Sequence, residues 1–511
     1  MEEVPIQIER KLMKEKLIEL RKILGKIADL RYAANVLDWD QQVYMPDDGD
    51  EERGEQIATI LEISHNLFVS DEVGKLLMDL QSESIDLDPN SDEARLIKVT
   101  QRDFDKETKI PVNLLVELSQ TTTMAHNAWV KAKTNNDFNS FQPYLEKIIE
   151  LTKQKAECFK PYEHIYDPLL DDYEPGMLTS DVKTIFSEIR PQQVDLIKSI
   201  SKSKQIDDSF LKIKYDPSKQ WQFGIDVAQA IGLDWKRSRL DTTEHPFTTT
   251  FGQKDVRITT NVSEAIPTSA FFSTIHETGH ALYELGFSPS LRRTPLSNAA
   301  SLAFHESQSR LWENLVGRSR QFWTYFFPKF KASFSEQLSN IDLESFYRAI
   351  NKVEPSFIRT ESDEATYNLH IMLRFELELE LIEGKLKVEH LPDAWNECMK
   401  DYLGIIPPND TLGVLQDVHW SAGLIGYFPT YAIGNLISAQ LWGKMHLDMA
   451  DLDDKICKGD FEELLSWLRT NIHQHGAKFE PQELIQNITG NKIEAQPYIR
   501  YLQTKYKEIY Q

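Results

Sequence analysis

Two histidines, His276 and His280, stand four residues apart with Glu277 directly after the first of them. In a helix, residues i and i+4 lie on one face, so both imidazoles can bind one tetrahedral zinc ion. Glu277 flanks the first of these histidines, where it can accept a proton from a zinc-bound water and later give it to a leaving amine. The spacing therefore predicts a catalytic metal site.

A catalytic zinc ion needs a third protein ligand and an open fourth position. The sequence offers two neighbouring candidates, Glu306 and His305, at the centre of a second helical segment. Glu306 would complete a metal site of two histidines and one carboxylate, whereas His305 would complete an all-histidine site. Spacing alone leaves both open.

The sequence also predicts the two helices that must position these residues. Residues 267–286 are predicted to form the first helix, since Pro267 suits an initial turn and Gly286 suits the residues after a helix end. Two Ser/Thr-Pro pairs then predict a turn, followed by a second helix over residues 296–318. Gly279, inside the first helix, costs about 1 kcal/mol of helix propensity relative to Ala, which a close approach by another element would explain.

Most of the remaining chain has the 3.6-residue periodicity of helices, beginning with Leu20, Ile23, Leu24 and Ile27. One exception precedes the metal motif: residues 247–251 and 256–260 are rich in β-branched residues and predict a β-hairpin. No repeat or linker divides the sequence. We therefore predict a mostly α protein with a single catalytic domain over residues 1–511. This domain could consist of two lobes.

The charge balance excludes several classes of partner. The chain of 511 residues has 57 Lys and Arg against 80 Asp and Glu, a net charge of −23, which argues against binding nucleic acid or anionic membranes. Its three cysteines exclude a disulfide framework, and its first residues lack a secretory pattern, so we expect a cytoplasmic protein. Residues 418–443 lack charged side chains but contain Pro and polar residues, which predicts a buried segment rather than a membrane span.

Six motifs in order make the sequence similar to the carboxypeptidase Taq family of metallocarboxypeptidases. The motifs are His245-Pro246-Phe247, Asp255-Val256-Arg257-Ile258-Thr259, His276-Glu277-Thr278-Gly279-His280, His305-Glu306-Ser307-Gln308, Ile358-Arg359-Thr360-Glu361-Ser362-Asp363 and Gly413-Val414-Leu415-Gln416-Asp417-Val418-His419-Trp420. Ser362 departs from the alanine usual in the family. The likeness extends over nearly the whole chain.

This resemblance implies His276, His280 and Glu306 as the metal ligands and Glu277 as the general base. It also implies one Zn²⁺ per chain, replaceable by Co²⁺, and a homodimer. The implied fold is a large helical zinc-peptidase fold with a deep active-site cleft, similar to neurolysin and angiotensin-converting enzyme. His245 and Arg257, from the first two motifs, are further candidates for substrate binding.

An enzyme that removes C-terminal residues must bind a free carboxylate, and the planar fork of arginine matches that group. Arg359 is our candidate for this clamp. The alternative is a structural ion pair with Glu361 or Asp363. Arg257 could also bind a carboxylate, although an arginine on a strand more often orders a neighbouring acid. Gln416 could bind substrate backbone or carboxylate.

The developing oxyanion needs a protein hydrogen-bond donor beside the metal. Similar helical enzymes use a histidine and a tyrosine after the metal helices, so we assign His419 and Tyr427, with Tyr431 as the alternative tyrosine. Asp363 and Asp417 could orient the metal-binding histidines. The pair His473 and His475 points apart on a helix, so we expect it at the surface or at a helix end.

The resulting hypothesis is a zinc carboxypeptidase acting on peptides with a free C-terminus. One competing hypothesis is an oligopeptidase that cuts internal bonds of short peptides with the same groups. Another is a zinc-stabilised, non-catalytic peptide-binding protein, which would need neither Glu277 nor an open coordination position.

Overall fold

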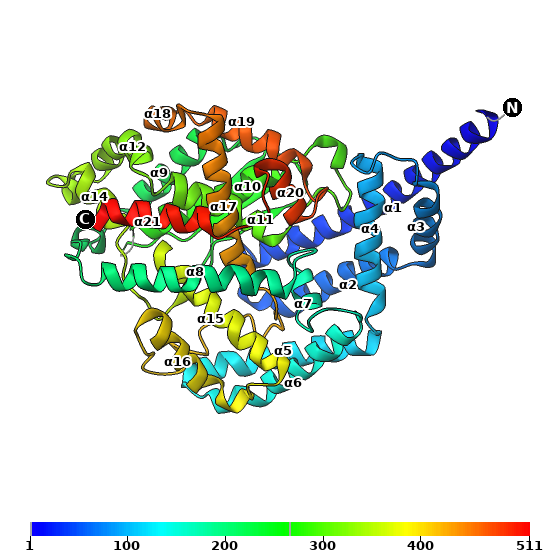
Figure 1. Cartoon of the computed structure of the whole chain (residues 1–511), viewed down its shortest axis with the longest axis horizontal. Coiled ribbons are helices and arrows are strands. Elements are labelled where there is room, and N and C mark those ends of the chain that lie inside the picture. Colours follow the sequence, from blue (N-terminus) through cyan, green and yellow to red (C-terminus); the bar gives the residue numbers. More distant parts are fainter. Residues whose placement is uncertain (1–2, 265–266, 511) are drawn as a thin grey trace.

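The computed structural model describes residues 3–264 and 267–510, and nearly all of its regular structure is helical (Figure 1). The helices are α1 (Glu3–Val43), α2 (Asp50–Phe68), α3 (Asp71–Glu83), α4 (Asp92–Lys109), α5 (Val112–Asn135), α6 (Phe138–Glu157), α7 (Asp167–Asp171), α8 (Thr179–Ile200), α9 (Pro217–Ala230), α10 (Pro267–Glu284), α11 (Leu302–Arg310), α12 (Arg320–Ser333), α13 (Ser335–Leu338), α14 (Leu343–Ile350), α15 (Glu364–Glu383), α16 (Leu391–Leu403), α17 (Pro429–Asp448), α18 (Leu452–Cys457), α19 (Glu462–Asn471), α20 (Pro481–Thr489) and α21 (Gln496–Tyr510). Three short turns also matter below, namely the π-helical η4 (Leu311–Val316), η5 (Arg359–Glu361) and η7 (His473–His475). The predicted mostly α class is confirmed.

The first four helices lie together at one side of the molecule, in blue in Figure 1. The periodic residues of α1, among them Leu20 and Ile23, are buried and join side chains of α3 and α4 in a hydrophobic cluster of their own. Ser91 caps α4 by accepting the backbone N–H of Ala94. A larger cluster contains the cores of the later helices. The division of the chain into one unit or two lobes stays a prediction.

Three strands form a small sheet beside α10, in the order β1 (Ser238–Thr242), β3 (Val256–Thr260), β2 (Thr248–Thr250). Strands β2 and β3 pair antiparallel, which confirms the predicted hairpin. Strand β1 pairs parallel with β3 and was not predicted, because its two charged residues, Arg239 and Asp241, hide the strand pattern. Val256 and Ile258 are fully buried, in a cluster that includes Ala281 of α10.

Helix α10 coincides with the predicted metal-binding helix. Helix α11 begins at Leu302 instead of residue 296, because the preceding residues form turns and the Ser301 hydroxyl caps the helix by accepting the N–H of Phe304. After Arg310 the chain widens into the π-helical turn η4. At Gly279, a Cβ atom would lie 2.7 Å from the carbonyl oxygen of Gln308, so the expected close approach exists, and α11 makes it.

Helix α17 packs against the other side of α11. A Cβ atom at Gly434 would lie 2.9 Å from the side-chain carbons of Glu306, so glycine is what allows the two helices to come this close. Between Pro429 and Leu441, every residue of α17 except Tyr431 is buried, which confirms the predicted burial for the central part of residues 418–443. Within the described ranges, the helices include none with the length and apolar character that crossing a membrane requires. The deep cleft and the likeness to neurolysin stay predictions.

Candidate active site

His276 and His280 on α10 meet Glu306 on α11, and one ligand atom from each lies within 4.8 Å of the others. The Nε2 atoms of both histidines lie 3.6 Å from Oε2 of Glu306. Metal–ligand bonds of about 2.0–2.1 Å in tetrahedral geometry separate ligand atoms by roughly 3.3 Å, so this donor set fits one zinc-sized ion. His305 instead bonds through Nε2 to Oε1 of Glu284 at 3.0 Å. The geometry therefore favours Glu306 over His305.

Glu313, on the π-helical turn, orients the first ligand. Its Oε2 accepts the Nδ1–H of His276 at 2.9 Å, which directs the other ring nitrogen towards Glu306. Arg310 lies between the two glutamates, with Nε 2.6 Å from Glu306 and Nη1 3.2 Å from Glu313. Burial raises the pKa of Glu306, but Arg310 and His276 outweigh it and hold that pKa well below its usual range.

The prediction that Asp363 and Asp417 orient the metal-binding histidines is not what the contacts show. Asp363 caps α15, where its carboxylate accepts the backbone N–H groups of Ala365 and Thr366. Asp417 binds two arginines, as described below. Glu313 was missed although the sequence offered a signal, since Glu306, Arg310 and Glu313 stand at positions i, i+4 and i+7, which share one face of a helix.

We expect Glu313→Gln to weaken metal binding. The amide loses the charge that stabilises the oriented His276, and removal of such outer partners typically lowers metal affinity or activity about 10–100-fold. Competition with a chromogenic chelator measures the affinity. Glu284→Gln is the matched control, since Glu284 bonds to His305 rather than to a ligand. Equal affinities in the two variants would contradict the orienting role.

Glu277 is buried, with 7% of its surface exposed, and the sheet holds it in place. The Thr248 hydroxyl, on β2, donates to Glu277 Oε2 at 2.6 Å. Burial raises the pKa of Glu277, which suits a carboxylate that takes and returns a proton. The hairpin that precedes α10 thus positions the candidate base, and Thr248 is a residue that the sequence did not single out.

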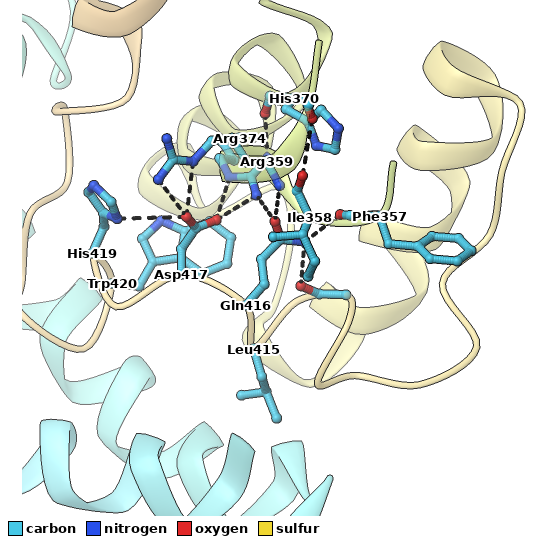
Figure 2. Close-up of polar contacts among 12 residues, drawn as sticks. Phe357, Ile358, Arg359, His370, Arg374, Leu415, Gln416, Asp417, His419 and Trp420 are labelled. Carbon is cyan, nitrogen blue, oxygen red and sulfur yellow. Dashed lines mark hydrogen bonds and ion pairs between the residues drawn. The ribbon is translucent and has the colours of Figure 1, made fainter. Parts of the chain in front are cut away.

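Arg359, on η5, is buried and faces the loop that follows α16. Its Nε donates to Asp417 Oδ1 at 3.0 Å (Figure 2). Its Nη1 donates to the hydroxyl of Tyr367 at 2.9 Å. The ion pair considered above therefore exists, but its acid is Asp417 instead of Glu361 or Asp363. Arg310 lies over the ring of Tyr367, 4.4 Å from its centroid, so one tyrosine connects Arg359 to the metal group.

Figure 2 shows Asp417 between two arginines. Arg374, on α15, donates from Nε to Asp417 Oδ2 at 2.7 Å and from Nη2 to Gln416 Oε1 at 2.8 Å. The same Gln416 oxygen accepts the backbone N–H of Arg359 at 2.9 Å, while its amide nitrogen donates to the carbonyl of Phe357 at 3.0 Å. Gln416 thus lies beside Arg359, where its amide joins two segments of the protein.

His419, Tyr427 and Tyr431 form one cluster. His419 Nε2 lies 3.2 Å from the hydroxyl of Tyr431, and the ring of Tyr427 is centred 5.3 Å from the rings of both. Tyr431 precedes Gly434 by three residues on α17, so both share the helix face that packs against α11. Burial lowers the pKa of His419 to about 4, so its imidazole is neutral at pH 7.

Three further residues that the sequence singled out do not belong to the groups described above. His245 is exposed in the loop before β2. Arg257 donates to Asp255 at 3.0 Å and lies 4.3 Å from the ring centroid of Trp39, so it orders a neighbouring acid. His473 is fully buried, with Nε2 3.0 Å from Oε1 of Gln308, and lies in the turn after α19, so of the two expected positions it takes the helix end rather than the surface. Substrate binding by His245 and Arg257 stays a prediction.

Two charged residues of α15 were also missed. Besides Arg374, the buried carboxylate of Glu378 accepts the indole N–H of Trp420 at 2.8 Å and the backbone N–H of Gly426 at 3.0 Å. These bonds hold both ends of the loop between His419 and Tyr427. Arg374 had a signal in the sequence, because it follows the run 365–373, which lacks Asp, Glu, Lys and Arg and where an unpaired charge is costly. Glu378 had none, because it alternates with other glutamates.

Comparison with known proteins places this geometry in a family. The model of the family described as carboxypeptidase Taq (M32) metallopeptidase matches residues 19–506. Thermostable carboxypeptidase 1 of Thermus thermophilus is 40% identical over 97% of this chain and 98% of its own length. Carboxypeptidase 1 of Bacillus subtilis is 38% identical over 96% of this chain and 97% of its own length.

Two solved structures have the same fold as this chain. The crystal structure of the M32 carboxypeptidase of Deinococcus radiodurans R1 superposes with a TM-score of 0.95 and 40% identity, and covers 97% of this chain and 99% of that one. Metallocarboxypeptidase 1 of Trypanosoma cruzi gives a TM-score of 0.92 at 32% identity, with coverage of 97% and 100%.

Proposed function

The chain belongs to the carboxypeptidase Taq (M32) family of metallopeptidases, and from this premise we propose that it is a zinc-dependent carboxypeptidase. Its substrates are peptides with a free C-terminus, from which it releases the last residue. The observation that supports this most directly is a buried arginine, Arg359, connected through Tyr367 and Arg310 to the His276, His280 and Glu306 group.

Arg359 has unused capacity for a carboxylate. Guanidinium has five N–H donors. Nε and Nη2 both face Asp417 Oδ1 at 3.0 Å, and Nη1 gives one bond to Tyr367, so these contacts use three of the five. The two remaining N–H groups belong to Nη1 and Nη2, which form the fork that pairs with a carboxylate in bidentate geometry.

The other residues divide the reaction between them. A zinc ion held by His276, His280 and Glu306 would supply a Lewis acid that polarises the scissile carbonyl and makes water more acidic. Glu277 accepts the proton of the attacking water and passes it to the nitrogen of the departing residue. His419, with Tyr427 or Tyr431, donates hydrogen bonds to the carbonyl oxygen as negative charge develops on it.

The decisive experiment compares an N-blocked dipeptide with its C-terminally amidated copy, using metal-loaded protein. We expect release of the last residue from the free acid and little from the amide. Fragments cut internally from longer amidated peptides would favour the oligopeptidase hypothesis. An absence of any product would favour the non-catalytic peptide-binding protein.

Arg359→Ala should lose activity on free-acid peptides and change little on amides. Removing one partner of a buried, charge-assisted bidentate pair lowers kcat/KM by about 10²-fold or more. Arg359→Lys should recover only part of the loss, because an ammonium group does not reproduce the fork. Steady-state kinetics on the acid and amide forms gives both values. Equal losses on the two forms, together with a lower melting temperature, would assign Arg359 a structural role.

The family resemblance also supports a homodimer and the replacement of Zn²⁺ by Co²⁺. All three cysteines are unpaired, which supports the cytoplasm as the compartment. Sedimentation of the purified protein tests the dimer, and reconstitution of metal-free protein with each ion tests the replacement.

A further inference from the structure

Arg374 is a completely buried charge, with 0% of its side chain exposed. A buried guanidinium is costly unless it is paired and hydrogen-bonded. Its partners are Asp417, Gln416 and the carbonyl oxygen of His370, to which Nη1 donates at 2.6 Å. No substrate atom is needed to explain any of these bonds, so Arg374 acts on its surroundings through Asp417 and Gln416.

The charges of this network do not cancel. Arg359 and Arg374 are positive and Asp417 is negative, and no more than 10% of any of these side chains is exposed. Gln416 is neutral, and so is His419 at pH 7. Glu378, one turn after Arg374, directs its oxygens to Trp420, Gly426 and Tyr166 rather than to the arginines. The three groups of the Arg359–Asp417–Arg374 triad therefore have one positive charge in excess.

We propose that Arg374 determines the selectivity for a free C-terminus, because it balances Asp417 and so leaves the charge of Arg359 available to a substrate carboxylate. Asp417 is also the group that fixes Arg359 in place. Without Arg374, the same carboxylate would neutralise the arginine that it orients. This inference rests on the proposed function, and in it Arg374 is a positioning residue that does not touch the substrate.

Variants that change the net charge of the triad distinguish this role from a purely structural one. Arg374→Met makes the triad neutral, and Arg374→Lys keeps the charge of the wild type. The double variant Arg374→Met/Asp417→Asn restores one positive charge, and the asparagine oxygen still accepts a hydrogen bond from Arg359. If Arg374 only supported the loop, removal of its partner as well would bring no recovery.

The test measures the ratio of kcat/KM on an N-blocked dipeptide to that on its amide. The ratio is taken within one protein preparation, so it does not depend on the fraction that is folded. We expect Arg374→Met to lower the ratio about 10²-fold, mainly through KM on the acid. Arg374→Lys should retain most of the ratio, and the double variant should regain at least about tenfold over Arg374→Met.

Arg190→Met is the matched control. Arg190 pairs with Glu376, and Glu376 lies two residues after Arg374 and thus on the opposite side of α15. The control removes one positive charge beside the same helix and should leave the ratio unchanged. Two outcomes would overturn this inference alone. In the first, the wild type prefers the acid and Arg374→Met keeps that preference. In the second, the double variant shows no recovery of the ratio. A wild type without acid preference would overturn the proposed function as well.

Discussion

Glu277→Gln should keep its metal and lose turnover by about 10²–10⁴-fold or more, the range expected when a general base is removed. Glutamine is nearly isosteric and leaves His276, His280 and Glu306 untouched. Its amide still accepts the hydrogen bond that Thr248 donates to the carboxylate, so the sheet contact survives. The only function removed is acceptance of a proton from water.

Two measurements are needed together for this variant. Elemental analysis should give the same metal content per chain as in the wild type, and kcat should fall on free-acid dipeptides. Glu284→Gln, the same substitution at the end of the same helix, should remain active. Near-normal turnover in metal-replete Glu277→Gln would reject the assigned role.

Glu306→Gln should lose both the metal and the activity. The substitution removes an anionic ligand, and it also leaves the charge of Arg310, now 2.6 Å from Glu306 Oε1, without that partner. Arg310 keeps its bond to Glu313, but the site has lost one negative charge beside a guanidinium that repels a divalent cation, so the loss should exceed that of a neutral ligand change. We expect metal content well below one ion per chain after dialysis and kcat reduced in proportion.

His305→Ala is the comparison for that variant. Its ring stacks on His280 with centroids 4.3 Å apart, so its removal affects packing but should leave one metal ion per chain. Circular dichroism of both proteins checks that the helices persist. Metal loss in His305→Ala with retention in Glu306→Gln would make His305 the third ligand.

The parts of the site that were predictable from sequence depend on local spacing. His276 and His280 share a face of α10 because of the helical repeat alone. The β2–β3 hairpin was visible for the same reason. Each of these features is encoded within a few residues, where propensity and periodicity act.

The parts that were not predictable depend on distant contacts. Arg359 pairs with Asp417, although two nearer acids were the obvious candidates, because the fold brings a loop of the chain beyond α16 against η5. Glu313 bonds to His276, 37 residues earlier in the chain, because the fold packs η4 against α10. Strand β1 is defined by its pairing with β3, since its own residues alternate weakly. No local pattern specifies these partners.

The contacts at Gly279 and Gly434 have a further consequence. With α10 against one side of α11 and α17 against the other, at distances that no larger residue would allow, the backbone fixes the three ligands. Such a site is preorganised, so we expect metal capture to require little loss of conformational entropy and the protein to stay folded when the ion is removed. A cell short of metal would therefore hold the enzyme as a folded reserve, ready for activation as soon as the ion became available.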